Sequence, residues 1–197
     1  MRRRLALALM LLGVVLIARG LYIPAKAALA QVLLENAWAE TQASGKSIKP
    51  WPWADMTPVA RLTVPRLEHD AIVLDSASGQ AMAFGPGHMS GTAAIGAPGT
   101  AVIAAHRDTS FRFLKDIAIG DLVTATTVSG IETRYRVTET RVVPADASGL
   151  DPAFGGAAGA RLALVTCYPF DGVLHSKLRF VVIADREASA PGAVARL

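Results

Sequence analysis

The chain has 197 residues, enough for one modest domain plus an appendage, and its hydrophobic content of 52% is high for a soluble domain. Its net charge of +4 comes with no basic run interleaved with aromatic residues, which argues against a nucleic-acid-binding protein. The single cysteine excludes an intrachain disulfide, and a core of this size does not need one.

The N-terminus carries the signature of a membrane anchor. Arg2-Arg3-Arg4 precedes an apolar run over residues 5–18, and the apolar character continues beyond Arg19 to Ile23, which gives about 19 residues, near the minimum for a bilayer span. We predict that residues 1–23 form an uncleaved transmembrane segment with a cytoplasmic N-terminus. The alternative is a cleaved signal peptide, for which small residues offer cleavage sites at Ala25, Ala27, Ala28 and Ala30.

Residues 24–58 are predicted to connect the anchor to a folded domain. Good helix formers and spaced apolar residues indicate a helix over 25–43, which either continues the span or lies against the domain. Prolines and the tripeptide Trp51-Pro52-Trp53 indicate a linker over 45–58. The tryptophans could lie at the membrane interface, but we expect them to pack on the domain.

From residue 59 to 186 the chain is typical of a β-rich domain. Strands are predicted over 60–64, 71–74, 101–105, 122–128, 132–143, 161–166 and 178–185. A short helix is predicted over 78–84, and long loops over 85–100 and 144–159. Seven or eight short strands imply an all-β sandwich or a closed barrel, a choice that the pattern alone does not make. The Ala/Gly/Pro-rich tail, 187–197, is predicted to be disordered.

Cys167 is the candidate nucleophile. It follows the apolar strand residues 162–165 and precedes Tyr168-Pro169, and because proline cannot continue a central strand, the thiol should lie at a strand end. A thiol attacks an amide as its thiolate, with a proton donor for the leaving amine and donors for the oxyanion. The alternative is that this lone cysteine is a small buried hydrophobic residue.

Two further residues leave strand ends as Cys167 does. His106 follows the buried run 102–105 and can serve as general acid and base, although a structural histidine is the alternative. Arg179 begins the last strand and carries a permanent charge suited to an oxyanion. Strand alternation places Lys177 on the same face as Arg179.

The other histidines give weaker signals. His69 is predicted to be exposed, His88 lies in the loop 85–100, and His175 lies in the loop after Cys167; the roles of the last two stay open. No histidine pair has metal-ligand spacing, so we predict neither a metal site nor a cofactor.

Three separated motifs resemble those of sortases, the cysteine transpeptidases that attach proteins to bacterial surfaces. Leu164-Val165-Thr166-Cys167 resembles their Leu-x-Thr-Cys signature, and its extension Tyr168-Pro169-Phe170 resembles class D and Gram-negative sortases. Ala105-His106-Arg107-Asp108 resembles their Gly-His-Arg-Asp segment, with Ala105 in place of glycine, and Leu-Arg-Phe-Val-Val at 178–182 resembles their arginine strand. Trp51-Pro52-Trp53 resembles the Gram-negative lead-in, while Ala163 departs from the threonine that many sortases have there.

The resemblance covers most of residues 60–185 and implies an eight-stranded closed β-barrel with short inserted helices, preceded by the transmembrane helix. It further implies Cys167 as nucleophile, His106 as general acid/base and Arg179 as oxyanion or substrate stabiliser. The expected partners are a substrate protein with a C-terminal, LPxT-like sorting signal and an amine acceptor on the cell envelope. The expected location is the inner membrane, single-pass, with the catalytic domain in the periplasm.

Two other functions stay open from the sequence. An L,D-transpeptidase-like cell-wall enzyme is also β-rich with Cys and His, but its Ser-x-Gly-Cys motif is absent around Cys167. An anchored β-domain that binds peptides or cell-wall polymer without catalysis would leave Cys167 incidental.

Overall fold

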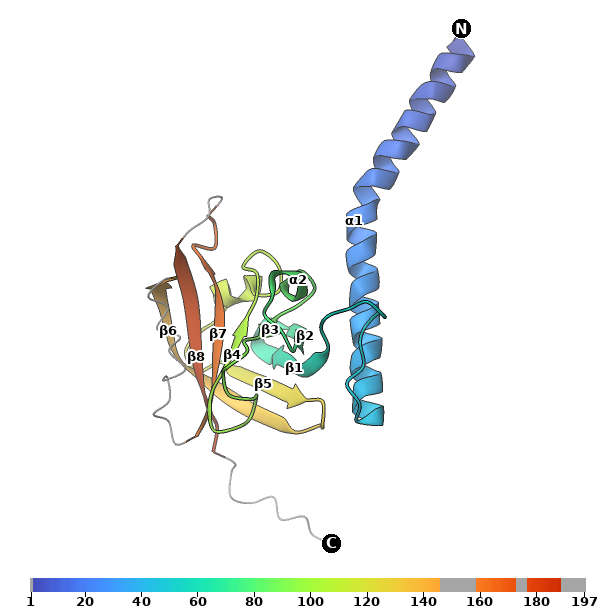
Figure 1. The fold of residues 1–197 in the computed structure, drawn as a ribbon. Helices are drawn as coiled ribbons and strands as arrows, with labels where there is room; N and C mark the ends of the chain where they lie inside the picture. The colour runs from blue at the N-terminus through green and yellow to red at the C-terminus, as the bar shows by residue number, and fades with distance from the viewer. Residues whose placement is uncertain (1, 146–158, 173–176, 189–197) are drawn as a thin grey trace.

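The computed structural model describes residues 2–145, 159–172 and 177–188. It contains two α-helices and two short 3-10 helices among eight strands in those residues (Figure 1). The helices are α1 (Arg2–Ser44), η1 (Pro65–Leu67), α2 (Gly79–Met82) and η2 (Arg112–Asp116). The strands are β1 (Pro58–Val64), β2 (His69–Leu74), β3 (Gly87–His88), β4 (Gly99–Ala104), β5 (Leu122–Thr127), β6 (Glu132–Pro144), β7 (Ala160–Tyr168) and β8 (Leu178–Arg186).

The strands close into one barrel in the order β1-β2-β3-β4-β7-β8-β6-β5. The pairs β2–β3 and β4–β7 are parallel and the other neighbours are antiparallel, so the barrel is mixed. This confirms the predicted fold class, an eight-stranded closed β-barrel with short inserted helices.

The burial of each strand follows from its place in the wall. Strand β1 alternates buried and partly buried residues, as expected for a strand with one face on the core. Strands β7 and β8 are buried on both faces, because an outer cluster built on Ala163, Val165 and Val181 is covered by Met89 and Val143. Their sequences are therefore continuous apolar runs, which makes them the clearest strands to predict.

The strand β3 is absent from the sequence prediction, which gives residues 85–100 as loop. It has only two residues, too few for any periodicity. Its position depends on a close approach, since a Cβ placed on Gly87 would lie 2.0 Å from the Ser76 carbonyl oxygen. Glycine is therefore required where β3 joins β2 to β4.

The helix α1 is continuous from Arg2 through Pro24 to Ser44. Figure 1 shows a bend in it, and its N-terminal half projects beyond the barrel. Within the described residues, α1 is the one helix long and apolar enough to cross a membrane, over Met10–Ser44.

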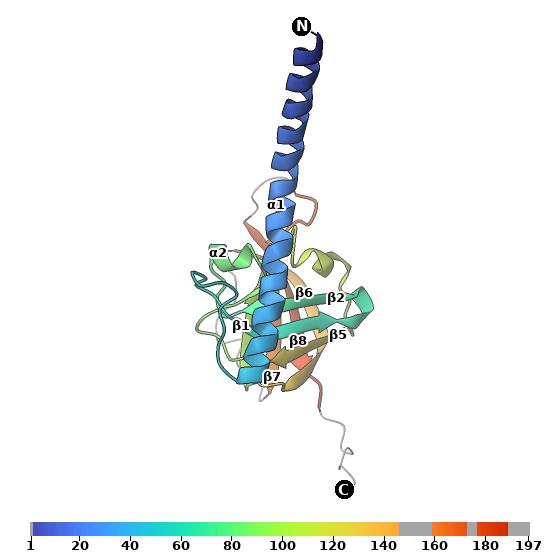
Figure 2. The same ribbon diagram turned by 90° about the vertical axis from the view of Figure 1, so that its right-hand side faces the viewer.

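The C-terminal half of α1 packs on the barrel wall. Leu34 and Trp38 are buried against Ile72 and Leu74 of β2, and Figure 2 shows this half lying across β1 and β2. Arg61 of β1 forms ion pairs with Glu35 of α1 and Asp70 of β2, and its guanidinium lies 5.7 Å from the Trp38 ring centroid. The helix and the barrel are thus joined by both apolar and charged contacts.

The two tryptophans of the linker differ in their surroundings. The Trp51 ring packs edge-on against Phe84, with centroids 4.9 Å apart, as expected for a residue that packs on the domain. Trp53 is 81% exposed, so the expectation is wrong for this residue.

Asp121, directly before β5, is buried and forms an ion pair with Arg66. It accepts hydrogen bonds from Arg66 Nε and Nη2, the latter at 2.6 Å, and from the Ala118 N–H at 2.8 Å. The Arg66 bonds, aided by Ala118 and opposed by burial, hold the pKa of Asp121 below its ordinary value. A depressed folded pKa adds stability above the unfolded pKa of about 3.9, and this stability is lost as the pH falls through the folded pKa.

We predict that Asp121→Asn lowers the thermal midpoint at pH 7 and has a smaller effect at pH 3, because below the unfolded pKa of about 3.9 the stability that the charge adds is being lost. Thermal unfolding of the full chain in detergent, followed by circular dichroism at both pH values, measures the difference. An equal deficit at pH 7 and pH 3 would contradict the role given to the charge.

Candidate active site

The strands β4, β7 and β8 are neighbours in the barrel wall, and they bring three predicted site residues to one rim. Cys167 is the last residue but one of β7, Arg179 is the second residue of β8, and His106 follows β4 by two positions. In the register, Cys167 pairs directly with Arg179 across the antiparallel β7–β8 ladder. Directly opposite residues share a face, with Cβ atoms about 4.5–5.5 Å apart.

The position of His106 follows from the parallel pairing of β4 with β7, which matches Ala104 with Val165. Beyond that pair the Ala105 N–H donates to the Val165 carbonyl at 3.2 Å, and the buried Thr166 hydroxyl donates to the Ala105 carbonyl at 2.8 Å. The next residues along the two strands are His106 and Cys167. The imidazole and the thiol therefore leave adjacent strands at the same level.

The side chains at this rim are open to reactants. Cys167 is a free, partly buried thiol on the outer face of the barrel, on the same side of β7 as Val165. Arg179 is partly buried and donates from Nη1 to the Leu178 carbonyl at 3.0 Å, and His106 is exposed. The rim thus offers a nucleophile, a cation and a group that can carry a proton, all at strand ends.

An aromatic group supports the chain directly after the thiol. Tyr168-Pro169 has a cis peptide bond, and β7 ends at Tyr168, as the proline predicts. Phe170 packs edge-on against Phe180 with ring centroids 5.2 Å apart, and both rings pack against the barrel core.

Arg107 is a rim residue whose role sequence reasoning missed. Its Nη1 donates to the Pro169 carbonyl at 2.5 Å and its Nη2 to the Gly172 carbonyl at 2.7 Å, while its Nε donates to Asp108 at 3.0 Å. The side chain is only 12% exposed. It joins the segment after His106 to the segment after Cys167. Arg107 is part of the motif Ala105-His106-Arg107-Asp108. Nothing in the sequence, however, indicates that it donates to carbonyl groups more than sixty positions away.

Arg107 also shapes the electrostatics of the rim. Its hydrogen bond to Asp108 raises the pKa of the guanidinium, and negative charge at Asp108, Cys167 and Asp171 adds to the effect. A permanent positive charge therefore lies within electrostatic range of the Cys167 sulfur. Arg107 and Asp108 also line a pocket of about 480 Å³ beside the rim, together with Arg112, Lys115, Phe170 and Asp171.

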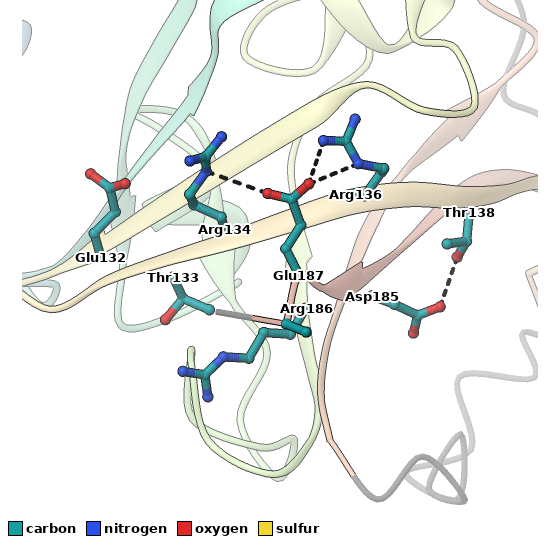
Figure 3. A pocket seen from close by; sticks show the side chains of 9 residues that line it. Glu132, Thr133, Arg134, Arg136, Thr138, Asp185, Arg186 and Glu187 are labelled. Atoms are coloured by element: carbon teal, nitrogen blue, oxygen red, sulfur yellow. Dashed lines mark hydrogen bonds and ion pairs between the residues drawn. The ribbon is translucent and has the colours of Figure 1, made fainter. Parts of the chain in front are cut away.

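A larger hollow, of about 640 Å³, lies at the other end of the barrel (Figure 3). In Figure 3 the Glu187 carboxylate lies between Arg134 and Arg136, with which it forms ion pairs. The lining of this hollow includes Asp185, which is six residues from Arg179 along β8 and hence about 20 Å away from it. The lining of the hollow contains no thiol and no imidazole. We interpret the hollow as a place where ion pairs hold the strand ends together.

The remaining histidines differ from one another. His69, expected to be exposed, is partly buried and stacks on Phe113 with ring centroids 3.9 Å apart. Burial lowers the pKa of His69. His88 Nε2 lies 2.8 Å from the Ala93 carbonyl oxygen, a contact within its own loop. His175 lies outside the described residues.

Across the described part of the chain, no cluster of three or more His, Cys, Asp or Glu residues could hold a metal ion.

We predict that Arg107→Ala speeds amide hydrogen exchange at Phe170, Asp171 and Gly172 about tenfold or more, because charge-assisted bonds to two carbonyls are lost. Arg107→Lys should give an intermediate rate, since an ammonium keeps the charge without the planar fork. Hydrogen exchange with mass spectrometry measures both. Arg112→Ala, which changes a cation in the same pocket, is the control, and equal exchange in all variants would contradict the role of Arg107.

A family model for the sortase domain matches residues 62–187, a range that includes His106, Cys167 and Arg179. Among solved structures, a Clostridium perfringens sortase D5 transpeptidase matches with a TM-score of 0.62 and 17% identity, over 82% of this chain and 99% of that one. Sortase C-1 from Actinomyces oris matches with a TM-score of 0.58 and 24% identity, over 66% and 73% of the two chains.

Sortase A from Corynebacterium diphtheriae matches with a TM-score of 0.59 and 21% identity, over 82% of this chain and 86% of that one. At such identities the structural matches establish a shared fold. No curated protein sequence matches the chain significantly.

Proposed function

The chain belongs to the sortase family, and on that premise we propose that it is a membrane-anchored cysteine transpeptidase with Cys167 as nucleophile. Its substrate is a protein with a C-terminal, LPxT-like sorting motif, and its acceptor is an amine of the cell envelope. One observation carries the proposal. The barrel register pairs Cys167 with Arg179 and brings His106 to the same rim.

In the first half-reaction the Cys167 thiolate attacks the backbone carbonyl carbon after the threonine of the motif. The carbonyl oxygen becomes an oxyanion, which Arg179 and a backbone N–H stabilise. The peptide C–N bond then breaks, and His106 donates a proton to the departing amine. The product is a thioester between the substrate and Cys167.

In the second half-reaction an incoming amine attacks the thioester carbonyl. His106, now neutral, accepts a proton from that amine, and the C–S bond breaks to release the Cys167 thiolate. A new amide joins the substrate to the acceptor. Water in place of the amine gives hydrolysis, so the accessibility of this rim to water sets the ratio of transfer to cleavage.

Specificity is assigned to the loops around the rim. Residues 85–100, which contain β3, pass next to β4 and hold Met89 against the outer cluster of β7 and β8. This cluster lies on the outer face that carries Cys167 and Arg179, so a bound peptide would meet it. The loop 144–159 is a second candidate, but most of it lies outside the described residues.

The apolar helix α1 supports the proposed membrane arrangement. Arg2–Arg4 keep the N-terminus in the cytoplasm, and the apolar part of α1 crosses the inner membrane once. The barrel then lies in the periplasm. The Tyr168-Pro169-Phe170 extension is the basis for placing the chain with class D-like and Gram-negative sortases.

We predict that Cys167→Ala abolishes acyl-enzyme formation while the thermal midpoint stays near that of the wild type, since the thiol lies at a partly exposed rim. Intact-mass spectrometry of the full chain with an LPxT-type peptide library and glycinamide measures the adduct and its transfer. Retained cleavage in this variant would refute the mechanism. No adduct in the wild type, together with slow iodoacetamide alkylation of Cys167, would favour a non-enzymatic binding domain.

We predict that Arg179→Ala lowers kcat for transfer by about 10²–10³-fold with a smaller effect on KM, because the oxyanion loses a charged donor. Arg179→Lys should recover only part of the rate, since an ammonium lacks the planar fork. Steady-state kinetics with a peptide that forms the adduct give both constants. The control is Arg161→Ala at the opposite end of the same sheet, where Arg161 forms an ion pair with Asp185. Equal losses at both positions would indicate a general effect on the fold.

A further inference from the structure

An apolar hollow of about 410 Å³ lies where α1 meets the linker and the α2 region. It is lined mainly by Leu29, Leu33, Trp51, Trp53 and Phe84, with the Lys26 ammonium as its charged group. Trp51 packs on Phe84, but Trp53 is 81% and Leu29 58% exposed. A large indole left exposed beside other apolar side chains marks a surface that meets an apolar partner.

The position of this hollow along α1 indicates the partner. The stretch from Leu5 to Pro24 has about 20 residues, which at about 1.5 Å per residue equals the roughly 30 Å thickness of the hydrocarbon core. Lys26 then lies just past the outer boundary, and Leu29 lies within about one further helical turn. An indole and a lysine at this level are the residue types that anchor proteins at a membrane–water interface.

The hollow is held at this position along α1 because the helix packs on the barrel. Leu34 is buried in the contact, and Gln31 donates from Nε2 to the Phe84 carbonyl at 2.9 Å beside the hollow. Ion pairing of Glu35 with Arg61 continues the contact one turn further. The hollow therefore keeps its height relative to the membrane-spanning part of the same helix.

We propose that Trp53, Leu29 and Lys26 form a membrane footing, through which the barrel rests on the headgroup region of the outer leaflet. The indole inserts at the glycerol level and the ammonium of Lys26 pairs with lipid phosphate. This inference rests on the proposed spanning role of α1.

The footing orients the reactive rim. Figure 1 shows that β7 ends and β8 begins on the side of the barrel toward the N-terminal half of α1. A barrel resting on its footing thus turns the rim that carries Cys167 toward the bilayer surface. The substrate would then be cleaved close to the membrane.

The test uses tryptophan fluorescence of the full chain in vesicles of phosphatidylcholine and phosphatidylglycerol, with bromine at shallow or deep acyl positions. We expect shallow bromines to quench the wild type more than deep ones, and Trp53→Phe to lose most of this quenching. Trp51→Phe is the matched control and should keep it, because Trp51 packs on Phe84. Trp38 is buried and should contribute little.

Equal quenching in the wild type and Trp53→Phe would overturn the footing. Blue-shifted Trp53 emission without bromine quenching would also overturn it, because a second copy or another protein would then cover the indole. Failure of the chain to float with the vesicles would overturn both the anchor and the footing. Transfer of a soluble peptide by Trp53→Phe in detergent should stay unchanged, so loss of the footing is distinguishable from failure of the proposed transpeptidation.

Discussion

The parallel pairing of β4 with β7 is the contact on which the rest of the rim depends. Six matched residue pairs connect the two strands, from Gly99 with Ala160 to Ala104 with Val165. On the other side β4 pairs with the two residues of β3, and the chain after β3 adds hydrogen bonds from the Met89 N–H to the Val102 carbonyl at 2.8 Å and from the Ala93 N–H to the Thr100 carbonyl at 3.0 Å. The β4–β7 ladder helps to close the barrel at this point, and it also sets the height at which His106 leaves the wall. Closure of the barrel and alignment of the candidate site residues therefore depend on the same strand pairing.

The strand ends are predictable because β4, β7 and β8 are buried on both faces. Apolar runs bounded by polar residues or a proline place Cys167, His106 and Arg179 at strand ends in the amino-acid sequence, and the resemblance of their motifs to those of sortases separates them from other residues in such positions. The register between the strands is not predictable from one sequence, because it depends on barrel closure. For the same reason sequence reasoning misses β3 and the bonds of Arg107, since each depends on chain segments far away in the sequence.

The tripeptide Trp51-Pro52-Trp53 shows a second limit of sequence reasoning. Two identical side chains, two positions apart, have opposite surroundings, because Phe84 covers one and no described residue buries the other. Residue type and hydropathy are equal for both, so only the packing of α1 and the α2 region separates them. His69 is a similar case, because its stacking on Phe113 depends on how η2 folds back over the barrel end.

Because α1 is continuous, it fixes the distance along its axis between the candidate membrane span and the barrel. The candidate membrane span and the segment that packs on the barrel belong to one helix. In the proposed anchored arrangement, the height of the rim that carries Cys167 above the bilayer therefore follows from the number of residues between the lipid boundary and Leu34. One inserted residue would raise the barrel by about 1.5 Å and turn it by about 100° about the helix axis, relative to the bend in α1. With the proposed anchor and activity, the cleavage site of a substrate would have to match a nearly constant distance from the lipid surface, so that this distance would select substrates together with their sequence.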